Sequence, residues 1–335
     1  MTYTKTKINE ERTLKSETRV TVIYAVKVIV LAFLLLMIYA LSATLSGLSA
    51  IGTSTDAMAT MNGTLLMILS YTIVLSYPII RSKWTGLKLI LAIAAAYYGL
   101  AVFLPQLDVV LFLDYFESLF DVTMVPKILI QGAIVTVLFV PLCVFVFRKM
   151  RSDTTNESSN ERPQIMSKKQ WAIKLGVIAC SYIILYVAAG ALIAWQNPEL
   201  AVYYGDLINQ MSAVGIWMLL FQGLRAIIFA AIAFPIIRLM KGKWWEKGFA
   251  VALLFSVLMS AAMLIPTSFM PDSVRMSHFL ELFSENFILG WIVTWLLHRP
   301  HSSIRDLFAM RIYSRNESLE QGETKENEKQ VPLLK

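Results

Sequence analysis

Apolar and polar stretches alternate along the whole chain. Eight mostly apolar runs, each near the ~20 residues that a bilayer core requires, are separated by shorter polar stretches. They cover residues 20–45, 62–80, 87–104, 127–147, 170–194, 213–237, 248–266 and 274–297. The first run is too long for a signal-peptide core and lacks a small-residue cleavage site, so it is interpreted as an uncleaved span. The pattern predicts an all-α integral membrane protein with eight transmembrane helices.

Composition agrees with a membrane protein. Of the 335 residues, 57% are hydrophobic and 16% are charged, whereas soluble domains carry about 25% charged residues. The net charge of +7 comes from Lys and Arg in short segments between the apolar runs and not from one basic face. The expected partner is therefore the lipid bilayer, with no nucleic acid.

The charges of the connecting segments alternate in sign. Segments 81–88, 148–169, 238–247 and 298–315 are basic, whereas segments 46–61, 106–121, 196–210 and 267–272 are neutral or acidic. Because basic loops stay on the cytoplasmic side, this alternation predicts that both termini are cytoplasmic. The expected location is the bacterial cytoplasmic membrane, with the chain as a multi-pass protein.

The two halves of the chain resemble each other. The matching stretches are 25–39 with 172–186, 77–81 with 234–238, 104–105 with 265–266, and 132–138 with 290–296. Matches in all four spans, in the same order, predict a tandem duplication of a four-helix unit. An even number of spans in each unit makes this a parallel repeat.

This repeat divides the chain into five parts. They are a cytoplasmic N-terminal segment (1–19), a first membrane repeat (20–148), a polar cytoplasmic linker (149–168), a second membrane repeat (169–298) and a partly disordered cytoplasmic tail (299–335).

The predicted repeats differ near their outer ends. In the first, Pro105 is expected to end the third span, and Pro126 to separate the fourth span from an interfacial or re-entrant helix at 108–121 that includes Asp114 and Glu117. The second repeat has no proline corresponding to Pro126. Its eighth helix is therefore expected to continue outward as a polar extension.

That extension contains a polar stripe. Arg275, His278, Glu281 and Glu285 recur at spacings of three, three and four, which places them on one side of a helix. Ionisable groups inside a membrane face a protein interior or an aqueous cavity and mark a functional site by default. The stripe is thus the candidate site.

Arg225 is the second ionisable residue expected at membrane depth. It lies 13 residues before Arg238, or roughly 20 Å along the helix. Glu285 has the same offset from His298, so Arg225 is expected to pair with Glu285, or else with Glu281.

Two further observations concern Arg225. Gln222 precedes it by three residues, shares its helix face and extends the polar cluster. The corresponding position in the first repeat is the apolar Ile68, which makes the cluster asymmetric.

Three interpretations fit this cluster: a structural ion pair between spans six and eight, a site for a polar or ionic solute, and a catalytic site. No catalytic residue is assigned. Cys143, Cys180 and the three histidines lack metal-site spacing, so no metal and no cofactor are expected. The sequence favours a non-enzymatic function over an enzyme without deciding between them.

The leading functional hypothesis is a transporter or binding protein. Its small polar or anionic solute would pass through a pocket between the two repeats. Arg225 would contact an anion, and Glu281, Glu285 and His278 are candidate proton-coupling groups. The alternatives are an intramembrane enzyme that acts on a lipid-linked substrate at the outer leaflet, and a non-catalytic membrane partner or assembly factor.

Overall fold

The computed structural model of the chain describes residues 2–48, 56–111, 123–151, 166–301, 303 and 306. The chain divides into a unit formed by residues 1–298 and a second unit formed by residues 299–335. In the second unit, Arg299 and Asp306 form an ion pair at 3.2 Å. Asp114, Glu117 and the predicted helix beyond Leu111 lie outside the described residues.

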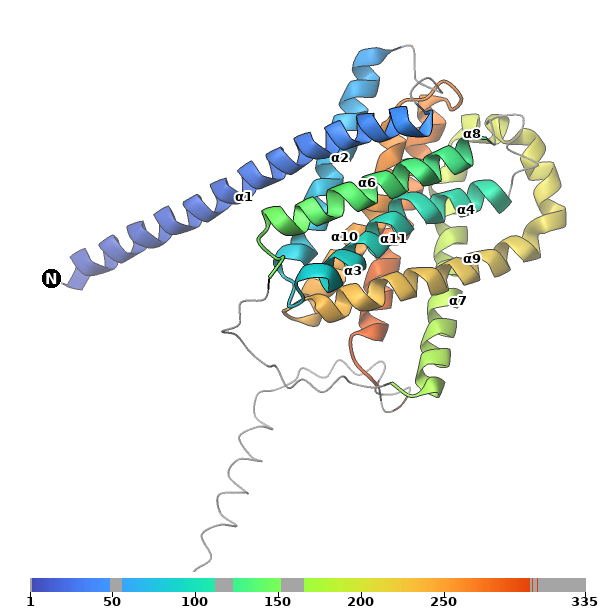
Figure 1. The fold of residues 1–335 in the computed structure, drawn as a ribbon. Coiled ribbons are helices and arrows are strands. Elements are labelled where there is room, and N and C mark those ends of the chain that lie inside the picture. The colour runs from blue at the N-terminus through green and yellow to red at the C-terminus, as the bar shows by residue number, and fades with distance from the viewer. Residues whose placement is uncertain are drawn as a thin grey trace, which may run out of the picture. The chain divides into compact units, whose positions relative to one another are not determined.

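The first unit is helical (Figure 1). Its elements are α1 (Thr2–Ser46), α2 (Ala57–Ile80), α3 (Gly86–Tyr98), the π segment η1 (Gly99–Phe103), α4 (Leu104–Leu111), α6 (Met124–Val146), α7 (Lys168–Leu192), the 3₁₀ segment η2 (Ala194–Gln196), α8 (Pro198–Tyr203), α9 (Gly205–Leu239), α10 (Trp244–Ser260), the 3₁₀ segment η3 (Ala261–Leu264) and α11 (Asp272–Leu297). Within the described ranges, extended pairing is limited to an isolated bridge.

Eight of the described helical segments are long and apolar enough to cross a membrane. They are Glu17–Ser46, Ala57–Ile80, Gly86–Val110, Met124–Val146, Lys168–Gln196, Trp217–Leu239, Trp244–Leu264 and Asp272–Leu297. Large side chains such as Val137 and Ile184 remain well exposed on the helix surfaces, as expected for residues that face lipid. The fold is that of a multi-pass membrane protein, as predicted.

The third span differs from the prediction. Pro105 does not end it, because α3, η1 and α4 follow one another without a break and continue to Leu111 (Figure 1). Proline normally clashes with the carbonyl four residues earlier. The wider turn of η1, directly before α4, accommodates the ring at this position. Asp108 is thereby carried on the end of a membrane-spanning helix.

The corresponding span of the second half ends earlier. There α10 tightens into the 3₁₀ turns of η3, and the helix stops at Leu264, two residues before Pro266. The following helix, α11, begins at Asp272 and runs uninterrupted to Leu297. It carries the whole predicted polar stripe.

Helix contacts follow the same pattern in both halves. In the first half α1 packs on α2 and α6, and α3 packs on α6; in the second, α7 packs on α9 and α11, and α10 packs on α11. Between the halves, α2 contacts α10, and α9 contacts α3. The second helix of each half therefore packs against the third helix of the other.

The turns that follow α2 and α9 also meet. Ser82 and Met240 form the antiparallel bridge, flanked by two backbone hydrogen bonds of 2.8 Å, one in each direction. Arg81 Nη2 adds an ion pair with Glu246 at 3.0 Å. These contacts join the two halves at the ends of α2 and α9.

Candidate functional site

The polar stripe lies on the outer half of α11. Arg275, Glu281 and Glu285 are 6%, 9% and 2% exposed, so three of its four side chains are buried in the protein. The stripe divides into an outer part around Arg275 and an inner part around the glutamates. The two parts make different contacts.

Arg275 ties α11 to neighbouring backbone. Its Nη2 forms an ion pair with Asp272 at 2.8 Å, and its Nη1 donates to the carbonyl oxygen of Met263 in η3. Both contacts lie at the start of α11 and away from the glutamates. These contacts anchor the start of the helix, and the predicted binding role of Arg275 stays a prediction.

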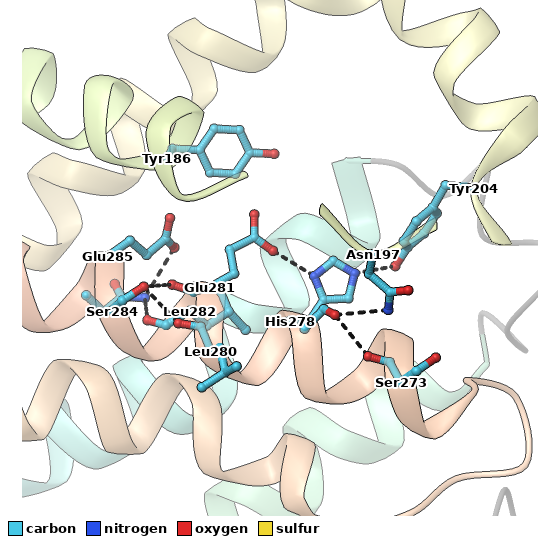
Figure 2. A network of polar contacts seen from close by, with 12 residues as sticks. Tyr186, Asn197, Tyr204, Ser273, His278, Leu280, Glu281, Leu282, Ser284 and Glu285 are labelled. Atoms are coloured by element: carbon cyan, nitrogen blue, oxygen red, sulfur yellow. Dashed lines mark hydrogen bonds and ion pairs between the residues drawn. The ribbon is translucent and has the colours of Figure 1, made fainter. Parts of the chain in front are cut away.

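His278 links Glu281 to the outer turn. Its Nδ1 lies 2.8 Å from Oε2 of Glu281, and its Nε2 lies 3.0 Å from the hydroxyl of Tyr204, between α8 and α9 (Figure 2). Burial raises the pKa of the Tyr204 hydroxyl above its ordinary value, and the Glu281 charge acts in the same direction. The hydroxyl therefore stays protonated, and His278 bridges it to the Glu281 carboxylate through its two ring nitrogens.

A second contact strengthens the same region. Asn197, which caps α8 through the backbone N–H of Glu199, donates from Nδ2 to Ser277 Oγ at 3.0 Å. Ser273 donates to the Glu199 carboxylate. The short helix α8 is thus held against the start of α11, and this contact positions Tyr204 beside His278.

Arg225 makes a different ion pair from the predicted one. Its Nη1 lies 2.9 Å from Oδ1 of Asp108, on α4. Neither Glu281 nor Glu285 lies within ion-pair distance of Arg225. The prediction of a direct pair with Glu285 or Glu281 is therefore wrong. Continuation of α4 beyond Pro105 is the reason, because it brings a third carboxylate to α9.

The surroundings of Arg225 are polar and aromatic. Its Nη1 donates to Oε1 of Gln222 at 2.8 Å, as the predicted shared helix face requires. Its guanidinium carbon lies 5.8 Å from the centre of the Tyr182 ring, a cation–π distance. The Arg225 side chain is 2% exposed, whereas Asp108 is 31% exposed. The pair therefore reaches from the interior to the protein surface.

Several buried atoms around Arg225 lack a hydrogen-bond partner within the protein. They are Nε and Nη2 of Arg225, Oδ1 of Asp108, the hydroxyl of Tyr182 and Oε2 of Glu285. Oε1 of Glu285 receives only a long contact of 3.3 Å from Nδ2 of Asn286. Buried polar atoms are nearly always hydrogen-bonded, so unpaired atoms gathered in one place are typical of a binding site.

Of the three carboxylates in this region, Asp108, Glu281 and Glu285, only Glu285 has no ion-pair partner among the described residues. Asp108 has Arg225 and Glu281 has His278, but no Lys, Arg or His of the described chain lies within ion-pair distance of Glu285. Figure 2 places Tyr186 of α7 on the same side of α11 as the carboxylates of Glu281 and Glu285. Its hydroxyl lies 3.7 Å from Met218 Sδ.

The described residues contain no group of three or more His, Cys, Asp or Glu side chains arranged to hold a metal ion. Cys143 and Cys180 are both free thiols.

Sequence reasoning missed Asp108, Tyr182 and Tyr204. Tyr182 was detectable, because it precedes Tyr186 by one helical turn and shares its face. Asp108 was placed in the predicted interfacial or re-entrant helix at 108–121, outside the third span, because Pro105 was expected to end that span. Tyr204 has no signal in the sequence, since its contact with His278 depends on how the turn after α8 folds back.

Comparison with protein-family models, with curated proteins and with solved structures finds no match to this chain. Its function is therefore inferred from its own residues and their contacts.

Proposed function

We propose that the protein binds and transports a small monovalent cation, the proton included, with Glu285 as the binding carboxylate. The observation that supports this is the buried, unpaired state of Glu285 on a membrane-spanning helix. A carboxylate in an apolar interior must either take up a proton or bind a cation, because an isolated buried charge costs several kcal/mol or more.

Charge balance favours a cation over the predicted anion. Arg225 was the expected anion contact, but Asp108 already neutralises it. Three carboxylates, Asp108, Glu281 and Glu285, then share the region with one guanidinium and with His278. The excess charge is negative whether His278 is neutral or protonated. A contact between Arg225 and an anion remains an untested prediction, and this balance weighs against it.

The position of the cluster supports a transport role. Asp108 belongs to the first half of the chain, and Arg225 and Glu285 belong to the second, so the cluster lies where the halves meet. The reciprocal contacts of α2 with α10 and of α9 with α3 are those expected if the halves are parallel repeats related by a two-fold axis. Transporters built from parallel repeats carry their site between them.

The test is ion flux through the purified protein in liposomes. With a trapped pH-sensitive dye and a potassium diffusion potential, the parent protein is expected to dissipate a proton gradient, or else to accumulate labelled sodium or methylammonium. The rate of Glu285→Gln should be at least about tenfold lower, because the neutral amide neither takes up a proton nor supplies the negative charge that attracts a cation. Liposomes with the parent protein that are as tight as empty ones would refute transport of these ions.

The matched control is Asp56→Asn. Asp56 is an exposed carboxylate that caps α2 by accepting from the backbone N–H of Ala59 at 3.0 Å. Asparagine caps helices equally well, so this variant loses one negative charge and keeps the fold. Its flux should equal that of the parent protein.

An enzyme is the second candidate. The chain Tyr204–His278–Glu281 has the hydrogen bonds of a general acid–base group. It would suit an intramembrane enzyme that acts on a lipid-linked substrate. Liposome flux separates the two candidates, because transport requires no lipid-linked substrate. A protein that shows no flux and instead co-purifies with another membrane protein would be a partner subunit.

Topology is tested by labelling. We infer that both termini are cytoplasmic and that the host membrane is the bacterial cytoplasmic membrane, from the alternating loop charges. Single cysteines at positions 54 and 268 should react with a membrane-impermeant thiol reagent in intact cells, and one at position 158 should react only after lysis. Labelling at 158 without lysis would contradict the eight-span topology.

A further inference from the structure

Arg225 has donors without a hydrogen-bond partner. The guanidinium uses Nη1 for both Asp108 and Gln222, while Nε and Nη2 remain without a hydrogen-bond partner. The 2.9 Å contact with Asp108 Oδ1 is an ion pair without hydrogen-bond geometry, since that oxygen also lacks a hydrogen-bond partner. An arginine with five donors is therefore held by only one carboxylate and one amide.

Glu285 offers the complementary acceptor. Its Oε2 is unpaired, its side chain is 2% exposed, and its helix, α11, packs against α9, which carries Arg225. Arg225 thus has one carboxylate in contact and a second, with an unpaired oxygen, on a helix that packs against its own. A guanidinium often binds a carboxylate through two parallel hydrogen bonds. Neither Asp108 nor Glu285 makes this two-bond contact with Arg225 in the structure.

We propose that Asp108 is a positioning residue, and that Arg225 exchanges between Asp108 and Glu285 according to whether Glu285 is occupied. When Glu285 holds a proton or a cation, it has no net charge to offer, and Arg225 stays with Asp108. When Glu285 is empty and charged, it attracts Arg225, and Asp108 is released.

The exchange has a mechanical consequence. Arg225 and Glu285 belong to α9 and α11 of the second half, whereas Asp108 lies on α4 of the first half. The Arg225–Asp108 pair therefore joins the two halves, and a pair between Arg225 and Glu285 does not. A proton or cation on Glu285 would therefore keep α4 bound to α9 through the Arg225–Asp108 pair. Loss of that proton or cation would release α4 from α9. Such a link between site occupancy and domain contact is what a transporter needs, and it rests on the proposed function.

The neighbouring groups determine the balance of the exchange. Glu281, from α11, repels charge on Glu285 and is itself held by His278. Tyr182 and Tyr186, from α7, add two hydroxyls: the Tyr182 ring lies 5.8 Å from the Arg225 guanidinium carbon, and Tyr186 lies on the same side of α11 as the carboxylates of Glu281 and Glu285. Arg225 from α9 and Asp108 from α4 complete the set. Among these residues, Arg225 alone is permanently cationic.

The experiment measures how accessible α4 is to a water-soluble thiol reagent. A reporter, Leu107→Cys, is placed beside Asp108 in the full-length protein with Cys143→Ala and Cys180→Ala. Its modification rate at one fixed pH is compared in the parent background, in Glu285→Gln and in Asp108→Asn. A fixed pH makes the parent and Glu285→Gln directly comparable, because both keep the same charge beside the reporter thiol, whereas Asp108→Asn also changes the ionisation of that thiol.

Glu285→Gln mimics the occupied state, so it should slow modification, whereas Asp108→Asn removes the contact and should speed it. The two variants are expected to differ by about fivefold or more, the size of a typical coupling between sites. Raising the pH should speed modification in the parent relative to Glu285→Gln. Equal rates in all three proteins at every pH would overturn the exchange.

Two controls keep the outcome interpretable. If Asp108→Asn does not fold, the comparison of the parent with Glu285→Gln decides alone, and equal rates again count against the proposal. Ion flux is measured on the same preparations. Flux without a change in labelling refutes the exchange and leaves transport intact, whereas the labelling pattern without flux supports the exchange and refutes transport.

Discussion

Replacing both Asp108 and Glu285 with their amides is expected to destabilise the protein by about 3–5 kcal/mol, the largest effect of any change in this region. Arg225 is 2% exposed and cannot lose its proton. With both carboxylates neutralised, the guanidinium is left buried without a counter-charge. The measurement is thermal unfolding of the purified protein in detergent.

The single variants should cost much less than the pair. Asp108→Asn leaves Glu285 available to Arg225, and Glu285→Gln removes a carboxylate that has no cationic partner. The double variant should therefore be less stable than the sum of the two single effects predicts, which is the signature of shared contact with one residue.

Adding Arg225→Met to the double variant supplies the control. This third change removes the unmatched charge and keeps an apolar side chain of similar length, so much of the lost stability should return. If Asp108→Asn alone costs the full amount and Glu285→Gln adds nothing to it, Glu285 does not substitute for Asp108. In that case the ion pair is purely structural.

Gly290→Ala is expected to lower stability by about 1–3 kcal/mol or more, although it adds a single methyl group. A Cβ at this position would lie 2.4 Å from Cα and 2.6 Å from the backbone nitrogen of Ala252. Both atoms belong to the backbone of α10 and cannot move aside as a side chain can. The two helices would have to separate, and α11 would shift together with Glu285.

Gly176→Ala is the matched control. It makes the same change in α7, at a position where a Cβ would have no heavy atom within 4 Å. Alanine is the better helix former by about 0.5–1 kcal/mol, so this variant should be as stable as the parent or slightly more stable. Equal melting temperatures for the two alanine variants would mean that α10 and α11 do not pack as closely as the structure shows.

Much of the fold was predictable because the bilayer requires a long apolar helix for every crossing. All eight predicted spans correspond to helices, and their ends differ by a few residues where a local cap decides the boundary. Asp56, for example, starts α2 at Ala57 instead of 62. The polar stripe was predictable for a related reason, since helical periodicity places residues three and four apart on one side.

Partners were not predictable in the same way. Matching Arg225 with Glu285 by depth assumed that helices are straight and that spans end where proline first appears. The π turn before Pro105 violated the second assumption and brought in Asp108. Likewise, nothing in the spacing of residues places Tyr204 beside His278, because that contact depends on the fold of the turn after α8.

The sequence by itself determined that the chain is a bundle of apolar helices and which residues carry charge inside it, because hydrophobicity and periodicity are properties of short stretches. Only the tertiary structure decided which charge meets which. Ion pairing depends on contacts of a few ångströms between residues more than a hundred positions apart, as for Asp108 and Arg225. Those contacts are set by helix irregularities and packing, and they leave Glu285 as the unpaired carboxylate on which the proposed function rests.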